Sequence, residues 1–170
     1  MTLAVTIRTL VQSDAEACAA IRREMLADAP WAFSSSVEID RGVDPAKVRE
    51  RLADPRHATI GVFDERGRLL GVAGIHCDTA PKMAHRAKVW GVYVKPEARG
   101  QRLGARIVSG AIEVARGWPG VNSVALSSSE RSKAAQKTYA ALGFTAWGRE
   151  PRALVVDGVT ADEIHMVLFL

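Results

Sequence analysis

The first third of the chain changes from strand-like to helix-like spacing of its apolar residues. Apolar and polar positions alternate around Leu3–Arg8, which predicts a strand. Ser13–Glu16 then matches a capping box, and apolar positions from Ala17 to Met25 recur at helical spacing, which predicts an amphipathic helix that ends before Pro30.

A short second helix and three strands follow. Asp44 and Pro45 have the residue types of an N-cap and a first helical position, and the helix is predicted to stop before Asp54-Pro55. The β-rich runs Thr59–Phe63 and Leu69–Ile75 are separated by a charged segment that contains glycine, which predicts a hairpin. A third strand is predicted over Ala87–Val94.

The second half alternates between helices and strands. We predict a helix from about Arg102 to Gly117, a strand over Val121–Leu126, a helix over Ala134–Leu142, and two or three strands from Phe144 to Leu170. Hairpins require antiparallel pairs, whereas the strand-helix-strand unit requires a parallel one. The sequence therefore predicts an α/β fold with a mixed sheet.

Composition narrows the class of protein. The chain has 170 residues, 48% of them hydrophobic, which is enough for one domain over residues 1–170 with an ordinary core. No apolar run approaches the roughly 18 residues of a membrane span, so we expect no membrane partner. The N-terminus has no signal-peptide pattern, which makes the cytoplasm the expected location. The two cysteines and four histidines have no metal-ligand spacing, so we expect neither a disulfide nor a metal.

The net charge of +4 favours an anionic ligand. The 23 Lys and Arg residues are interspersed with 19 Asp and Glu residues and form no basic block. Nucleic-acid binding requires a dense basic stripe, so we expect no nucleic-acid partner. A small, highly charged anion fits the sequence better.

A glycine-containing loop supplies a place for such an anion. Residues Arg99–Gly104 read RGQRLG and lie between a predicted strand and a predicted amphipathic helix. Free backbone N–H groups and the positive end of the helix dipole make this a site for a phosphate or pyrophosphate. The alternative is that Gly100 and Gly104 only shape a tight turn.

Two segments resemble motifs of the GNAT superfamily of N-acetyltransferases. Residues Val92–Gly104 read VYVKPEARGQRLG and resemble its acetyl-CoA-binding segment, although Arg102 stands where a glycine is usual. Residues Ser132–Phe144 read SKAAQKTYAALGF and resemble its later motif, with Ser132 in place of the usual Asn. The resemblance extends over about residues 1–170.

The resemblance implies a fold and a set of residues that bind acetyl-CoA. The implied fold is a mixed, mostly antiparallel sheet of six to seven strands with about four helices, splayed at the strand that ends near Val94. The implied cofactor-binding residues are Val92, Tyr93, Val94, Arg99, Gly100, Gln101, Arg102, Leu103, Gly104, Ala105, Ser132, Ala135, Lys137 and Tyr139.

The resemblance also implies direct transfer of an acetyl group from acetyl-CoA to an amine. Tyr139 would protonate the leaving thiolate as general acid, and the backbone N–H of Val94 would stabilise the oxyanion. The strand before the loop has no carboxylate, so the general base is open between His76, Glu24 or Asp28, and an ordered chain of water molecules.

Residues before the loop are expected to hold the acceptor. By the resemblance, Glu24, Asp28, Trp31 and Phe33 are candidates to bind a cationic amine with apolar bulk. The alternative is that the two aromatic residues only anchor the loop. We expect a small-molecule primary amine as acceptor. Two alternatives to this function stay open, namely acetylation of a protein N-terminus or lysine and a non-catalytic acyl-CoA-binding module. A homodimer also stays open.

Overall fold

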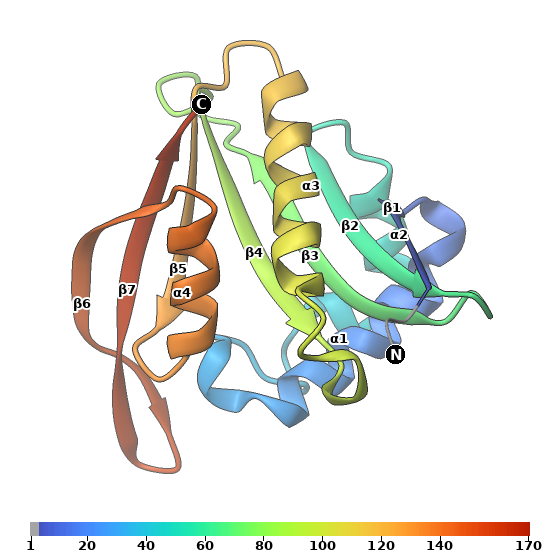
Figure 1. The fold of residues 1–170 in the computed structure, drawn as a ribbon, viewed down its shortest axis with the longest axis horizontal. Coiled ribbons are helices and arrows are strands. Elements are labelled where there is room, and N and C mark those ends of the chain that lie inside the picture. Colours follow the sequence, from blue (N-terminus) through green and yellow to red (C-terminus); the bar gives the residue numbers. More distant parts are fainter. Residues whose placement is uncertain (1–3) are drawn as a thin grey trace.

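The computed structural model describes residues 4–170 and contains a twisted seven-stranded sheet between two layers of helices (Figure 1). The strand order is β1-β2-β3-β4-β5-β7-β6, and all neighbours are antiparallel except β4 and β5. The strands are β1 Val5–Thr9, β2 His57–Asp64, β3 Leu69–Cys77, β4 Arg86–Val94, β5 Ser123–Ser129, β6 Thr145–Val156 and β7 Val159–Phe169. The helices are α1 Ala15–Asp28, α2 Pro45–Leu52, α3 Leu103–Gly117 and α4 Lys133–Ala141. The predicted mixed α/β fold is therefore confirmed.

Helices cover both faces of the sheet (Figure 1). On one face α3 and α4 bury a core that includes Ile107, Val108 and Tyr139 against the strands. On the other face α1 and α2 bury a second core around Met25 and Val48. No helix within residues 4–170 is both long enough and apolar enough to cross a bilayer.

The start of the chain differs in detail from the prediction. Leu3, the first residue of the predicted strand, lies outside the described residues. The capping box at Ser13–Glu16 is wrong, because a 3-10 turn precedes α1 and Asp14 caps that turn. The Asp14 carboxylate accepts hydrogen bonds from the backbone N–H of Val11 (2.8 Å) and from the Arg8 guanidinium. An ion pair to the first strand thus replaced the local cap.

Other local signals are confirmed. The Asp44 carboxylate accepts the Ala46 backbone N–H at 2.9 Å and caps α2. Asp64 accepts the backbone N–H groups of Arg66 and Arg68 in the turn between β2 and β3. The C-terminal region forms one long hairpin, β6 and β7, and its turn contains Gly158 in a left-handed conformation.

The sheet opens between β4 and β5. These strands pair in parallel only from Arg86↔Ser123 to Lys88↔Ala125, although both continue beyond those residues. A bulge at Gly91 and Val92 changes the register of β4 against β3, and Gly91 adopts a φ of 59°. A bulge bends and twists its strand, so β4 turns away from β5 and a gap forms in the sheet (Figure 1).

The packing of α3 leads to a test of stability. Ile107 is fully buried between α3 and the sheet, so Ile107→Ala is expected to lower the free energy of unfolding by about 2–5 kcal/mol. Ser109→Ala, on the exposed face of the same helix, is the matched control. Urea unfolding of both variants measures the difference, and equal midpoints would contradict the assignment of Ile107 to the core.

Candidate active site

A cavity of about 80 Å³ lies in the gap between β4 and β5. Tyr139, Ala135 and Ser132 line it from α4, and Val89–Val92 line it from β4. Leu126–Ser128 of β5 complete the wall, together with the loop after α1. The fold therefore brings together four predicted site residues from two segments that lie about forty positions apart in the sequence. One cavity contains Val92 from the first segment and Ser132, Ala135 and Tyr139 from the second.

Tyr139 has the surroundings of a neutral proton donor. Its ring is buried and packs edge-on against Phe144, with ring centroids 6.1 Å apart. Burial raises the pKa of the Tyr139 hydroxyl to about 12. Among residues 4–170 nothing forms a hydrogen bond with this hydroxyl. The phenol is therefore protonated at neutral pH and available to a group in the cavity.

The backbone of Val94 faces the same gap. Lys95 donates its backbone N–H to the Leu70 carbonyl on β3 at 2.9 Å. Successive residues of a strand direct their N–H groups to opposite edges, so the Val94 N–H is directed toward the edge that β5 has left. The Val94 carbonyl on that edge accepts a hydrogen bond from Arg99 Nε at 2.9 Å, which agrees with this orientation.

The loop before α3 is open enough for an anion to approach its backbone. Cβ atoms built on Gly100 and Gly104 would meet no heavy atom within 4 Å. No side chain caps the first turn of α3, and that turn contains no acidic residue. The backbone N–H groups of a fifteen-residue helix are thus exposed to an anion at its N-terminus.

The backbone conformation of Arg102 explains why a glycine is usual at this position of the motif. Arg102 precedes α3 with a φ of 57° and a ψ of 19°, in the left-handed region that favours glycine. An arginine therefore keeps the loop conformation at a cost in backbone strain and adds a positive charge next to the helix N-terminus.

Arg99 and the predicted acceptor acids are already paired. The Arg99 guanidinium binds Asp28 at 2.6 Å and stacks over Tyr93, whose hydroxyl donates to the same carboxylate. Glu24 pairs with Lys95 at 2.6 Å. Both pairs tie the end of α1 to the loop after β4, and neither acid lines the cavity.

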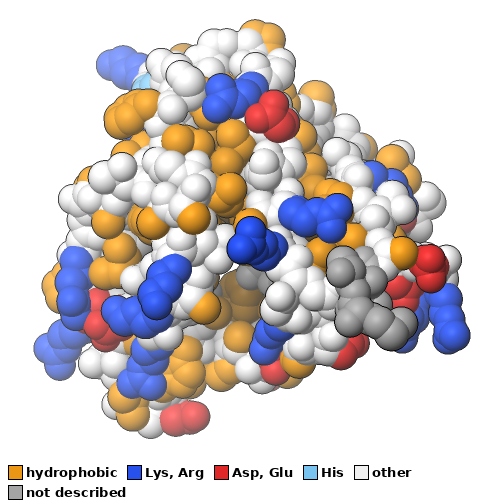
Figure 2. All heavy atoms as spheres, viewed as in Figure 1, with side chains coloured by type: hydrophobic (Ala, Val, Ile, Leu, Met, Phe, Trp, Pro, Cys, Tyr) orange, Lys and Arg blue, Asp and Glu red, His pale blue; other side chains and the backbone are white. Residues whose placement is uncertain are grey.

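Basic side chains surround a hollow between α4 and the lower end of α3 (Figure 2). Arg102 is exposed at the start of α3, and Lys133 and Lys137 are exposed on α4. Of the other predicted residues, Leu103 is buried in the core and Ala105 is half-buried. Gln101 lies in the loop with its side chain partly covered.

His76 lies outside the cavity. Its ring stacks on His57 with centroids 5.3 Å apart, and its Nδ1 is buried without a hydrogen-bond partner in the described part of the chain. Burial, with help from His57 and Lys88, lowers the pKa of His76. The geometry therefore gives His76 no direct contact with an acceptor in the gap.

The two aromatic residues of the loop after α1 have different surroundings. Phe33 lines the cavity, whereas Trp31 stacks against the Arg131 guanidinium at 3.7 Å from its ring centroid. Trp31 thus anchors the loop, and Phe33 shapes the cavity.

A second cavity of about 180 Å³ continues the gap on the face of α1. Its lining includes Ser127, Glu163, Lys88 and Arg22, which sequence reasoning did not select. Period-two alternation in the last strand places Glu163 and His165 on one face. Their position at the gap follows only from the pairing of β7 with β5.

Comparisons with known proteins agree with this geometry. The model of the acetyltransferase (GNAT) family matches residues 19–144, which include both motif segments. None of the curated proteins matches the chain.

Solved structures show the same fold. The chain is similar to an acetyltransferase of the GNAT family from Streptococcus pneumoniae, with 20% identity, a TM-score of 0.84, and coverage of 98% of this chain and 100% of that one. A putative acetyltransferase, yncA from Salmonella typhimurium, solved with acetyl-CoA, has 24% identity, a TM-score of 0.81 and coverage of 98% and 94%. A phosphinothricin acetyltransferase from Sinorhizobium meliloti, in complex with AcCoA, has 20% identity, a TM-score of 0.83 and coverage of 100% and 89%. The match of the family model to most of the chain shows that this protein belongs to the GNAT family of acetyltransferases.

Proposed function

We propose that the chain acts as a single N-acetyltransferase domain that transfers an acetyl group from acetyl-CoA to the primary amine of a small molecule. The observation that carries this proposal is the gap between β4 and β5, where the unpartnered Tyr139 hydroxyl and the edge of β4 line one cavity. Two similar structures contain acetyl-CoA, which supports the same donor here.

The residues at the start of α3 fit the anionic part of this donor. Coenzyme A contains a pyrophosphate and a 3′-phosphate. In the proposal, the loop from Gly100 to Gly104 binds the pyrophosphate through backbone N–H groups. Arg102, Lys133 and Lys137 add positive charge beside it, while Arg99 holds the loop against Asp28. These three residues give part of the chain's net charge of +4 a role in binding the donor.

The cavity and the free edge of β4 next to it supply two of the interactions that acyl transfer requires. The backbone N–H of Val94 donates a hydrogen bond to the oxygen that becomes negative as the amine attacks the thioester carbonyl. Tyr139 then donates its proton to the departing sulfur, whose thiol has a lower pKa than a phenol. In the proposal both groups act within one ternary complex, in which the amine attacks the thioester directly.

The loop after α1 favours a small acceptor. Ala32 and Phe33 line both cavities and cover the gap on the face of α1. A protein lysine or N-terminus would need an open groove at this place. We therefore propose a small amine that enters through the second cavity.

A charge change in the loop tests the donor site. Acetyl-CoA at about 100 times its Kd is expected to stabilise the wild-type protein by about 2.7 kcal/mol, which raises the Tm by roughly 5–11 °C. Gly104→Glu is expected to abolish this shift, because its carboxylate occupies the site of the pyrophosphate. The variant without ligand keeps its Tm, since the new side chain enters open space and an acid is favourable at a helix N-terminus.

Gly117→Glu, at the other end of α3 and also in open space, is the matched control and is expected to keep the shift. An unchanged shift in Gly104→Glu would contradict the role of the loop. No shift in the wild-type protein would contradict acetyl-CoA as the donor.

Removal of the Tyr139 hydroxyl tests the acid. Tyr139→Phe is expected to lower kcat by about 10²- to 10⁴-fold while the Tm shift with acetyl-CoA is retained, because the ring still fills its site against Phe144. Release of CoA with saturating amine measures kcat. Turnover equal to that of the wild-type protein would exclude Tyr139 as the acid.

A further inference from the structure

We propose that Glu163 accepts the proton of the acceptor amine and that His165 and Glu150 pass it on to solvent. This inference rests on the proposed function, because it supplies the base which that reaction needs. It assigns a third role in the gap, after the acid and the oxyanion donor.

The two cavities adjoin each other at the gap, and we call them together the passage. They share six lining residues, namely Ala32, Phe33, Val89, Trp90, Gly91 and Ser127. Tyr139 lines the part on the face of α4, and Glu163 lines the part on the face of α1. Glu163 is also the one acidic residue among the described residues that line this passage.

Strand pairing fixes the direction of the Glu163 side chain. Ile164 and Met166 pack in the core under α3 and α4, so the alternate residues Glu163 and His165 face the side of α1. Glu163 lies opposite Ser129 of β5, and His165 lies opposite Ser127. The paired strand therefore directs the carboxylate into the second cavity on the face of α1, with β5 between β7 and the gap.

A path for the proton leads from Glu163 to the surface. Donor and acceptor atoms of Glu150, Glu163 and His165 all lie within 4.8 Å of one another. His165 Nε2 is 3.1 Å from Glu150 Oε2, and the Glu150 side chain is 57% exposed. Glu150 and Glu163 lie directly opposite each other on β6 and β7. Two carboxylates in this position repel each other, and the His165 ring lies close to both of them.

The other charged groups near Glu163 do not compete for this role. Arg22 on α1 is held by Asp40 in an ion pair of 2.6 Å. Lys88 on β4 lines the same cavity and is a positively charged neighbour of Glu163. The predicted bases Glu24 and Asp28 are engaged by Lys95 and Arg99.

The proton balance of the reaction requires such a group. An ammonium ion must lose one proton to Glu163 before its nitrogen can attack the thioester carbon. The C–N bond forms and the C–S bond breaks, and the nitrogen then loses its second proton. Tyr139 gives its proton to the CoA sulfur and is reprotonated by the second proton of the nitrogen, while the first proton passes from Glu163 through His165 and Glu150 to solvent.

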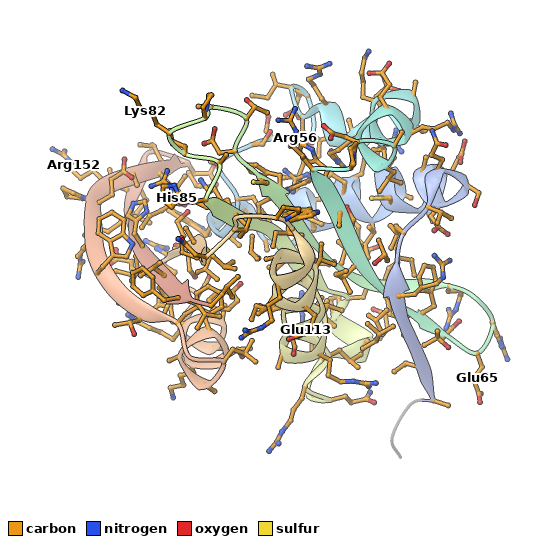
Figure 3. All side chains as sticks on the ribbon, turned by 90° about the horizontal axis from the view of Figure 1, so that it is seen from above. Arg56, Glu65, Lys82, His85, Glu113 and Arg152 are labelled. Carbon is orange, nitrogen blue, oxygen red and sulfur yellow. The ribbon has the colours of Figure 1, made fainter. Side chains whose placement is uncertain are left out.

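The test compares Glu163→Gln with Glu65→Gln, an exposed position at the tip of the hairpin of β2 and β3, far from β6 (Figure 3). The probes are tyramine, putrescine and L-glutamine, with CoA release measured from pH 6 to pH 10. With whichever probe the wild-type protein accepts, Glu163→Gln is expected to lower kcat/KM by about 10²- to 10⁴-fold at pH 7. The deficit is expected to shrink toward pH 10, where the amine loses its proton without a base. Glu65→Gln retains wild-type values.

Further measurements separate a role in proton transfer from a role in folding. Glu163→Gln is expected to keep the Tm shift with acetyl-CoA, and His165→Gln is expected to show a smaller loss of kcat/KM with the same recovery at high pH. A deficit of Glu163→Gln that is equal at all pH values, or full activity at pH 7, would overturn the proposal. Loss of wild-type activity in EDTA with recovery in Zn²⁺ would also overturn it, because the three side chains would then be metal ligands. If the wild-type protein releases no CoA with any probe but binds acetyl-CoA, the proposed function fails instead.

Discussion

The separation of β4 from β5 is the constraint on which the rest of the site depends. A continuous sheet would satisfy every backbone group between these strands and leave no room for a substrate. Three parallel register pairs hold the strands together at one end, and the bulge at Gly91 turns β4 away beyond them. The free edge of β4 and the cavity beside Tyr139 both follow from this divergence.

Two cores support the sheet around the gap. The helix pair α3 and α4 packs on one face and the pair α1 and α2 on the other, so each face of the sheet has its own core. Ion pairs from Asp28 to Arg99 and from Glu24 to Lys95 join the end of α1 to the loop after β4. These contacts position the glycine loop relative to the free edge of β4.

The passage has two chemically different sides. The side of α4 presents the neutral phenol of Tyr139. The side of α1 presents the Glu163 carboxylate and the ring of Phe33 together with Lys88 and Arg22, and His165 lies beside Glu163. In the proposed function, this separation lets the proton of the amine and the proton of the thiol travel by different routes. The sheet itself keeps the two routes apart.

Local patterns in the sequence were enough to predict most elements and to mark the candidate residues of the donor site. The cap at Asp44, the turn at Asp64 and the alternation of strands and helices depend on neighbouring residues, and the structure confirms them. Tyr139 and Gly104 are candidates from the two motif segments alone, because each segment is continuous in the sequence. Local reasoning was wrong at Ser13–Glu16, because Asp14 is paired with Arg8 of another element.

The acceptor side was decided only by tertiary structure. Glu163 lines the second cavity because β7 lies between β5 and β6 and pairs with β5. Asp28 does not line it, and its carboxylate is bound by Arg99, which lies seventy-one positions away in the sequence. The sequence by itself determined the elements and marked the glycine loop and Tyr139 as candidates. Only the tertiary structure decided which carboxylate lines the cavity and which are held in ion pairs, because strand order and long-range ion pairs arise from packing between distant segments and leave no local pattern.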